Sequence, residues 1–418
     1  MSETKKENQE DRTDTAKPER RRLGGDFWRL WWANAVNSVG DGVFLAAMPL
    51  LAVTVTKDPQ QVSVISAAGY LPWLLVSLPA GAIVDRHDRA TLMWRFQAFQ
   101  AVVVIVVALA AAADKLSVPA LALAGFLLGS AQVVITNAAQ SVLPQVVPAK
   151  LLQRANSNQY MVQTVGASSL GPPVGSLLFV VAAALPFAVD AGSFVVSAIL
   201  LATLPRSMGH IGRRAPMRTE MAEGLRWLKN HKLLRTLAVL LGVNSFCNRM
   251  GLATLVLFAT QTLHLSDRAY GLLLVGEGVG SLLGGLTSVW IARRMGSIHA
   301  FVLALAANVA IYLSIGLAPN AASLAAMLAL CGFVITLSTV VTTSLRQQII
   351  PGQLLGRVNS VFRMLGWGLM PIGALVGGVV AQELGLRAPF LIAAAVRALC
   401  LAAALRSLLT EARTVREE

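Results

Sequence analysis

Apolar residues in this chain come in long, uninterrupted runs separated by short polar stretches. "AVVVIVVALAAAA" at 101–113 and "LALAGFLLG" at 121–129 are two of these runs. A helix needs about 20 mostly apolar residues to cross a bilayer, and it satisfies its backbone hydrogen bonds within its own segment. The pattern predicts twelve transmembrane helices, at 28–53, 61–84, 91–112, 119–141, 155–181, 184–204, 235–260, 268–292, 298–317, 322–345, 355–381 and 387–409.

The second half of the sequence repeats the first. "QVVPAKLLQRANS" at 145–157 returns as "QIIPGQLLGRVNS" at 348–360, and "NS" at 37–38 returns at 244–245. The two matches have nearly the same spacing, as two copies of one unit with slightly different loops would give. Six helices, a basic linker and six more helices are typical of a two-lobed secondary transporter, whose substrate site lies between the lobes.

Charged residues are few, and the basic ones gather in particular loops. Only 13% of the residues are charged, against roughly 25% in a soluble domain. Lys and Arg concentrate in the loops after even-numbered helices and in the amino-terminal tail, so the positive-inside rule predicts cytoplasmic termini. The net charge of +14 is then a topology signal with some attraction for anionic lipid. A nucleic-acid partner is not expected, because the charges are scattered over many short loops.

The sequence offers no residue set for catalysis, a metal or a cofactor. The cysteines fall inside predicted helices and read as small buried residues, namely Cys247, Cys331 and Cys400. The five histidines have no ligand spacing. No G-x-x-x-x-G-K-[ST] loop is present, which excludes an ATP-driven pump in one chain. We therefore expect a transporter that needs no cofactor, not an enzyme.

The predicted fold is an all-α membrane protein with two pseudo-symmetric six-helix lobes, placed in a bacterial inner membrane as a monomer. The expected parts are a disordered cytoplasmic tail at 1–26, an amino-terminal lobe at 27–204, a cytoplasmic linker at 205–234, a carboxy-terminal lobe at 235–409 and a tail at 410–418.

One loop carries a family resemblance. "GAIVDRHDR" resembles the G-x-x-x-D-R-x-x-R loop motif of the major facilitator superfamily, and it matches at Gly81, Asp85, Arg86 and Arg89. Glycine lets a neighbouring helix pass close to the backbone, an Asp can face the positive start of another helix, and Arg pairs with carboxylates or phosphates. The resemblance implies that this loop latches the two lobes on the cytoplasmic side, near the start of the eleventh helix.

A second motif lies in the fifth predicted helix. "GASSLGPPVG" resembles the antiporter motif of the superfamily's exporters through Gly166, Gly171, Pro172 and Gly175. Small residues let membrane helices approach closely, and Pro172 removes one helical hydrogen bond. In this family the motif implies proton-coupled export. Ser176 departs from the pattern, because a second glycine is common there.

The linker extends the resemblance to one branch of the superfamily. "EGLRWLKNHKLLR" at 223–235 is similar to the linker of macrolide-efflux and enterobactin-exporter proteins. It reads as a basic amphipathic helix on the membrane surface, with Leu225, Trp227 and Leu228 toward lipid. Many proton-driven exporters have an Arg in helix 4, but Gly125 stands at that place here.

Three charged residues inside predicted helices are the leading functional candidates, since charges there are costly. Asp41, Arg249 and Glu277 lie at a similar depth on helices 1, 7 and 8. A carboxyl in an apolar, partly wet site can take up and release protons, and Asp41 is the first choice for the proton site. Two alternatives remain open: Arg249 and Glu277 form a structural pair, or Asp41 serves a helix kink or a hydrogen-bonding role beside Gly40 and Gly42.

Other polar residues inside the membrane are weaker candidates. Four of them are predicted to line the substrate cavity, namely Asn34, Asn37, Asn244 and Arg363. Asp190 and Arg397 are assigned structural roles, because helices 6 and 12 usually lie outside the cavity in this family. Aromatic residues that could stack on a flat lipophilic substrate are Tyr70, Trp73, Phe246 and Trp367.

The sequence therefore predicts export of a small amphiphilic molecule, such as a drug, antibiotic or siderophore-like metabolite, in exchange for protons. Two alternatives stay open. The chain could be an uptake symporter or uniporter of the same fold, or a membrane sensor or scaffold that does not transport. Lipophilic walls discriminate weakly between substrates, so the sequence leaves the transported compound unnamed.

Overall fold

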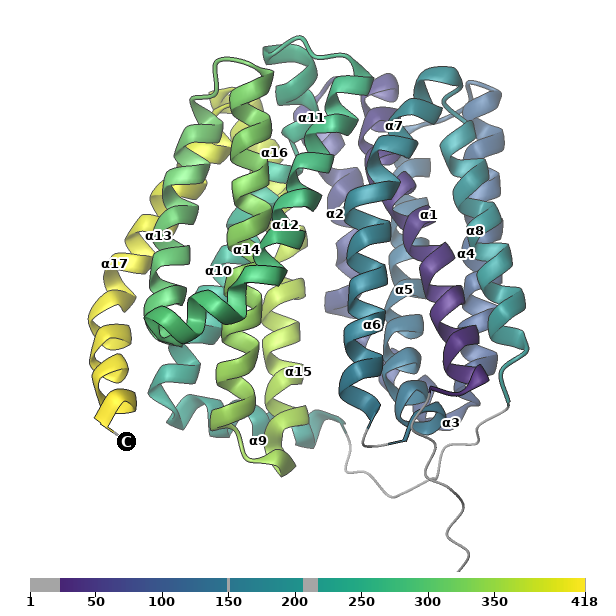
Figure 1. Ribbon diagram of the computed structural model, residues 1–418. Helices are drawn as coiled ribbons and strands as arrows, with labels where there is room; N and C mark the ends of the chain where they lie inside the picture. Colours follow the sequence, from purple (N-terminus) through teal and green to yellow (C-terminus); the bar gives the residue numbers. More distant parts are fainter. Residues whose placement is uncertain (1–22, 149–150, 206–216, 418) are drawn as a thin grey trace, which may run out of the picture.

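The computed structural model describes residues 23–148, 151–205 and 217–417, and its regular structure is helical throughout that part of the chain. The first half forms one bundle in Figure 1, built from α1 (Gly25–Val55), α2 (Pro59–Leu75), α3 (Ser77–Arg86), α4 (Arg89–Ala112), α5 (Val118–Val146), α6 (Leu152–Thr164), the π-helical η2 (Val165–Leu170), α7 (Gly171–Val181) and α8 (Leu185–Ala202).

The second half forms a second bundle beside it. Its elements are the linker helix α9 (Met217–Asn230), α10 (Lys232–Leu252), α11 (Leu255–Leu257), the π-helical η3 (Phe258–Thr262), α12 (Asp267–Met295), α13 (Ser297–Gly316), α14 (Ala321–Ile349), α15 (Gly352–Gly368), α16 (Met370–Leu384) and α17 (Ala388–Glu417).

Eleven helical segments of the described residues are long and apolar enough to cross a membrane. The one predicted helix that is missing from these eleven, at 61–84, is divided into α2 and α3 around Val76. Pro79 has no N–H to donate to the carbonyl of Leu75, and α2 ends at that residue after 17 residues. The twelve-helix pattern is therefore kept, with one of its members broken by a proline.

Prolines also break the helix that carries the second sequence motif. Pro172 and Pro173 cannot donate to the carbonyls four residues earlier, and the preceding turn widens into the π-helix η2. Such widened turns are frequent at functional sites. The segment α6–η2–α7 is thus one irregular membrane helix.

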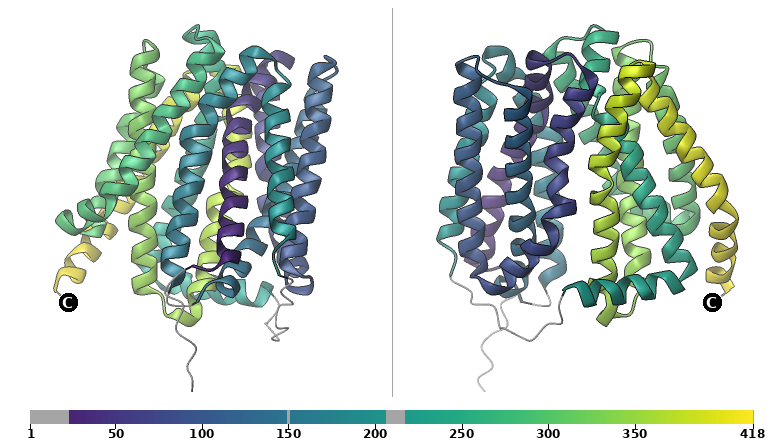
Figure 2. Two further views of the ribbon diagram at one scale, coloured as in Figure 1. Left: turned by 45° about the vertical axis from the view of Figure 1, so that its right-hand side comes forward. Right: turned by 180° about the vertical axis from the view of Figure 1, so that it is seen from behind.

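The two bundles pack tightly at one end and diverge at the other (Figure 2). At the closed end α16 lies against α2, where a Cβ on Gly378 would lie 2.5 Å from the Cβ of Ser63. A second contact between the lobes joins α12 to α7, where a Cβ on Gly271 would lie 1.8 Å from the Ser176 hydroxyl oxygen. Only glycines allow these approaches between lobes. Helix α9 and the end of α17 lie at the other, open end (Figure 1).

The linker helix α9 forms where the amphipathic pattern predicts it, but it packs on protein. Gly224 touches the backbone of α15, since a Cβ there would lie 2.8 Å from the carbonyl oxygen of Arg357. Glu223 forms an ion pair with Arg357. Leu228 is buried in the core of the second lobe, so its predicted contact with lipid is wrong, whereas Leu225 is exposed.

Candidate functional site

A cavity of about 500 Å³ lies between the two lobes. Its walls come mainly from α1, α2, α5 and α8 of the first lobe, and from α10, α12 and α15 of the second. The aromatic residues that line it are Phe44, Tyr70, Trp73, Phe194, Tyr270 and Trp367. The charged and amide-bearing residues that line it are Asp41, Gln100, Gln132, Gln163, Asp190, Arg249 and Glu277. The volume is typical of a site for a drug-sized ligand.

Asp41 reaches the cavity from a tightly packed part of α1. Its carboxylate accepts a hydrogen bond of 2.9 Å from the side-chain amide of Asn37, one turn earlier. The glycines on either side bring neighbouring helices close. A Cβ on Gly40 would lie 2.6 Å from Oδ1 of Asp190 in α8, and a Cβ on Gly42 would lie 2.7 Å from the carbonyl oxygen of Ala167 in η2. Helix α1 runs on as one helix to Val55, and the hydrogen bond from Asn37 agrees with the hydrogen-bonding role that the sequence left open for Asp41.

Glu277 of α12 lines the cavity from the second lobe. It is also flanked by glycines: a Cβ on Gly276 would lie 3.2 Å from the carbonyl oxygen of Ala325 in α14, and one on Gly278 would lie 2.0 Å from that of Ser168 in η2. The π-helical segment η2 is therefore held between the helix of Asp41 and the helix of Glu277. Both acids line the same cavity.

Arg249 faces the cavity but has an aromatic partner. Its guanidinium lies over the ring of Tyr70, 4.2 Å from the ring centre, a contact between α10 and α2 across the lobe boundary. Among the ion pairs between described residues, none joins Arg249 to Glu277. The structural pair that the sequence left open is thus not formed in this conformation, and both groups are presented to the cavity.

Aromatic side chains form part of the cavity wall. Trp73 of α2 stacks on Trp367 of α15 with their ring centres 4.5 Å apart. Phe44 meets Phe187 edge to face at 5.8 Å. Tyr70, Trp73 and Trp367 line the cavity as flat apolar surfaces, whereas Phe246, the fourth aromatic candidate, is not among the lining residues.

The four polar residues predicted to line the cavity do not line it in this structure. Asn34 donates to Oε1 of Gln159 at 2.6 Å and so ties α1 to α6. Asn37 supports Asp41 from behind. Asn244 belongs to a separate polar cluster in the second lobe, and Arg363 of α15 is half-buried away from the cavity. The position of a residue along a helix gives its depth in the membrane. The rotation of the helix about its axis decides whether the side chain faces the cavity, and the sequence does not give that rotation.

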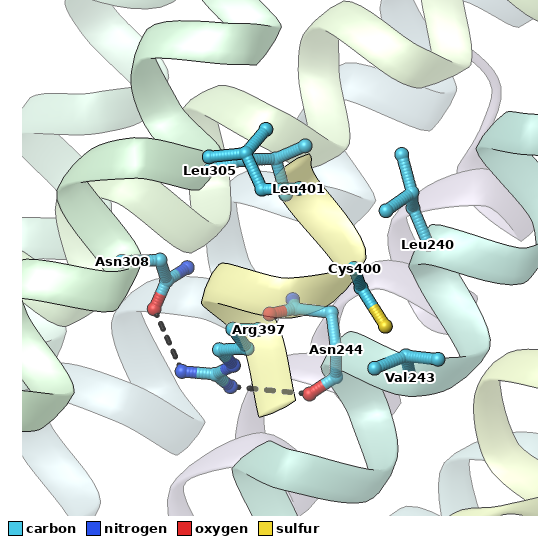
Figure 3. Close-up of a pocket in the computed structure, with 8 residues that line it drawn as sticks. All are labelled: Leu240, Val243, Asn244, Leu305, Asn308, Arg397, Cys400 and Leu401. Atoms are coloured by element: carbon cyan, nitrogen blue, oxygen red, sulfur yellow. Dashed lines mark hydrogen bonds between the residues drawn. The ribbon is translucent and has the colours of Figure 1, made fainter. Parts of the chain in front are cut away.

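That separate cluster surrounds Arg397 of α17 (Figure 3). The guanidinium donates to Oδ1 of Asn308 at 3.0 Å and to the carbonyl oxygen of Asn244 at 3.1 Å. It also lies 3.7 Å from the ring centre of Tyr312, which accepts a hydrogen bond from Asn248. The adjoining cavity of about 10 Å³ has room for a single water molecule. The cluster joins α10, α13 and α17, and the small cavity shares no lining residue with the large one.

Asp190 lies at the large cavity, although the sequence predicts a structural role for it outside the cavity. This residue of α8 is only 1% exposed, yet it lines the large cavity. The Ser193 hydroxyl lies 2.8 Å from its carbonyl oxygen and 3.4 Å from Oδ1. Its Oδ2 has no hydrogen-bond partner in the described part of the chain. The sequence feature that points to this position is Gly40, which permits α8 to come close.

The two family motifs occupy different parts of the molecule. Gly171 and Gly175 of the antiporter motif press on α1, where a Cβ would lie 2.4 Å from Cα of Gly42 or from the carbonyl oxygen of Val43. The loop motif lies at the open end, with Gly81 and Arg86 in α3 and Arg89 starting α4. The side chain of Asp85 lies outside the described residues, so the predicted latch stays a prediction.

Helix α5 has glycines where it meets α2, including the position of the Arg found in many exporters. It packs directly on α2, since a Cβ on Gly129 would lie 2.3 Å from the carbonyl oxygen of Gly69. Gly125, at the place of the missing Arg, would bring a Cβ within 3.4 Å of the Gly69 nitrogen. That distance is an ordinary contact, and the charged residues that line this cavity come from α1, α8, α10 and α12.

Comparison with known proteins agrees with this architecture. A family model described as transmembrane secretion effector matches residues 23–417. The multidrug efflux pump Tap of Mycolicibacterium fortuitum is 26% identical over 386 residues, covering 88% of this chain and 92% of that protein. Macrolide efflux protein A of Streptococcus pyogenes is 24% identical over 376 residues, covering 88% of this chain and 92% of that protein.

Among solved structures, a bacterial homologue of the iron transporter ferroportin has a similar fold. In its inward-facing state the TM-score is 0.73 at 17% identity, covering 92% of this chain and 98% of that one. In its outward-facing state the TM-score is 0.61 at 18% identity, covering 91% and 98%. The twelve-helix fold of such transporters therefore extends over the whole described part of this chain.

Proposed function

The chain belongs to the transmembrane secretion effector family of major facilitator transporters, multi-pass proteins of the cell membrane, and on this premise we propose that it exports an amphiphilic compound in exchange for protons. The observation that carries the proposal is the cavity between the lobes, which combines aromatic walls with three carboxylates and one guanidinium. Intramembrane charges are expensive and are kept where a substrate or ion passes.

The lining of the cavity favours a particular kind of compound. Three acidic residues against one basic residue, Asp41, Asp190 and Glu277 against Arg249, give a negative balance whenever the acids are ionised. A positive group on the substrate would be attracted there, while its apolar part would pack on Trp73 and Trp367. The names of the relatives, a multidrug pump and a macrolide efflux protein, support a compound of drug-like size.

The outward direction of transport in this proposal is supported by the efflux relatives and by the predicted orientation. The open end of the molecule carries α9 and the basic loop at 86–89, which the positive-inside rule assigns to the cytoplasm. The higher TM-score against the inward-facing ferroportin homologue supports an inward-open conformation. Export begins with cytoplasmic substrate entering this cavity, and the lobes then rock to open the opposite end.

Coupling to protons rests on the acids of the cavity. A carboxylate that binds the positive group of a substrate cannot hold a proton at the same time, so the two ligands exclude each other. Asp41 is the primary exchanger, because it faces the cavity from the helix that packs on α8 and on η2. Glu277 and Arg249 place the second set of charges on the opposite lobe.

The test uses purified protein in liposomes that contain a pH-sensitive dye and carry an imposed proton gradient. Erythromycin and ethidium are added separately to wild type, to Asp41→Asn, and to Glu383→Gln, an exposed acid at the end of α16 that serves as the control. We expect at least one compound to discharge the gradient with wild type and Glu383→Gln, and the signal to fall to that of protein-free liposomes with Asp41→Asn.

The remaining outcomes separate the alternatives. Compound movement that is equal in all three proteins and moves no protons would replace antiport by facilitated diffusion. Accumulation of compound along the proton gradient would indicate an uptake symporter. If neither compound moves, the same assay is repeated with a wider set of cationic, neutral and anionic amphiphiles, and a uniformly silent result would favour a sensor or scaffold.

A further inference from the structure

The surroundings of Asp190 indicate a functional role for this residue. It is 1% exposed in α8, its Oδ2 has no hydrogen-bond partner among the described residues, and it lines the large cavity. An ionised carboxylate buried without a partner is strongly disfavoured. In the cluster around Arg397, by contrast, the buried charged group donates hydrogen bonds to Asn308 and to Asn244.

The position of Asp190 relative to Asp41 is set by Gly40. Because residue 40 has no side chain, α8 comes so close to α1 that Oδ1 of Asp190 would lie 2.6 Å from a Cβ placed there. Asp41 is the next residue along α1 and lines the same cavity. Any residue larger than glycine at position 40 would occupy the space between the two acids' helices.

Asn37 completes the arrangement. It is 7% exposed, and its amide donates to Asp41, while its own Oδ1 has no partner in the described chain. Asp41 and Asp190 therefore line one cavity, Asn37 lies behind Asp41, and one oxygen each of Asn37 and Asp190 has no partner among the described residues. We call Asn37, Asp41 and Asp190 the acidic cluster.

We propose that Asp190 is a second proton-carrying residue, and that Asp41 and Asp190 bind and release protons as an interacting pair across the contact between α1 and α8. This inference rests on the proposed proton coupling and adds to it a residue on a different helix. Two neighbouring acids titrate in steps that belong to the pair. The pair can keep one proton while Asp41 exchanges with substrate, which limits the buried charge.

Other charged groups define the background against which the pair acts. The remaining titratable residues lining the cavity are Tyr70, Arg249, Tyr270 and Glu277. Among the helices packed on α8, α7 has no charged residue, and α4 carries its two arginines, Arg89 and Arg95, within its first two turns at the open end. On α1, Asp26 and Arg29 pair with each other at the far end. Thus Asp41 is the acid that approaches Asp190 from the packed helices.

The experiment measures protons alone and needs no knowledge of the substrate. Infrared difference spectra of the purified protein in lipid are recorded between acidic and alkaline pH, and the C=O stretching band of protonated carboxyl groups is followed. Wild type is compared with Asp41→Asn, Asp190→Asn, the double variant, and Asp190→Glu. Glu383→Gln is the exposed control. Gel filtration and circular dichroism confirm that each variant is folded.

We expect Asp190→Asn to remove one component of the carboxyl band and to shift the titration of the Asp41 component by about one pH unit or more, the mark of interacting groups. Asp190→Glu should restore a titrating band at a new frequency. The double variant should lose both components and keep that of Glu277.

A carboxyl band that Asp190→Asn leaves unchanged in size and titration would overturn the proposal, as would two components that titrate independently. If Asp190→Asn fails to fold, the spectra of Asp190→Glu and Asp41→Asn still test the proposal. An Asp190 carboxyl band whose titration is unchanged by the removal of Asp41 would show that the two acids do not interact. Failure of the proposed export would look different, since it would leave these spectra intact while liposomes show no proton-coupled transport.

Discussion

The two lobes carry polar clusters at matching places, and the clusters have opposite charge. Asn244 of α10 occupies the position that repeats Asn37 of α1, and Asn248 repeats Asp41. In each lobe the partner helix is the sixth, α8 with Asp190 or α17 with Arg397. The first lobe thus has the acidic cluster, and the second has an arginine cluster made of Asn244, Asn308, Tyr312 and Arg397.

The clusters differ in what surrounds them. The acidic cluster opens on a cavity of about 500 Å³ and leaves Oδ2 of Asp190 unpartnered among the described residues. The arginine cluster surrounds a cavity of about 10 Å³, and its guanidinium has two hydrogen-bond acceptors and an aromatic ring. On the function proposed above, the first lobe uses its cluster for proton exchange, whereas the cluster in the second lobe holds three helices together.

This comparison predicts opposite consequences for removing the charge in each lobe. Arg397→Met should lower the free energy of unfolding by about 3 kcal/mol, because hydrogen bonds to a charged group contribute about 1.5–3 kcal/mol each and Asn308 is left unpaired. The protein that does fold should transport normally. Thermal unfolding in detergent measures the first effect, and liposome assays normalised to folded protein measure the second.

The matched control is Arg406→Met, an exposed arginine on the same helix, whose stability should stay close to wild type. A folded Arg397→Met that has lost transport would contradict the comparison, because the arginine cluster would then take part in the cycle. Asp41→Asn is the converse case, with transport lost and stability kept.

The contact that builds the acidic cluster can be broken without touching an acid. In Gly40→Ala the new Cβ would lie 2.0 Å from the Ser193 hydroxyl oxygen, and such overpacking costs about 1–3 kcal/mol. Separation of α1 from α8 should also weaken proton-coupled transport. Gly192→Ala in α8 is the control, since nothing lies within 4 Å of its added Cβ.

A second change tests the cause of that loss. Adding Ser193→Ala to Gly40→Ala removes the nearest atom, although the Cβ of residue 193 would still lie 2.7 Å away, so partial recovery of stability is expected in thermal unfolding. If Gly40→Ala is as stable and active as wild type, the close approach of α1 and α8 does not matter for the acidic cluster.

Most of the fold could be predicted from the sequence, because the membrane imposes a simple rule on length and polarity. The predicted helix at 298–317 is α13, Ser297–Gly316, and others agree within a few residues. The rule misses irregular turns. The division at Val76 and the π-helix η2 depend on where a proline removes a particular hydrogen bond, which an apolar run does not reveal.

The site could be predicted only in part. Asp41, Arg249 and Glu277 meet at one cavity as predicted from their depth, because an intramembrane charge has few tolerable surroundings. Asn34 and Arg363 were misplaced, since depth does not give the rotation of a helix. The role given to Asp190 came from the usual place of helix 6 in the family. Glycines beside acids, as at Gly40 and Gly278, carry the missing information on close contacts.

The smallest expected effect concerns a charge pair outside both clusters. Glu223 of α9 and Arg357 of α15 form an ion pair at the open end, and their side chains are 45% and 33% exposed. Because exposed pairs contribute about 0–1 kcal/mol, Glu223→Gln should change thermal unfolding only slightly, and less so in high salt. The exchange Glu223→Arg with Arg357→Glu should restore the wild-type value. A loss of stability from Glu223→Gln as large as that from Arg397→Met would mean that the linker helix depends on this pair for its docking. The burial of a charged residue would then not indicate how much that residue stabilises this protein.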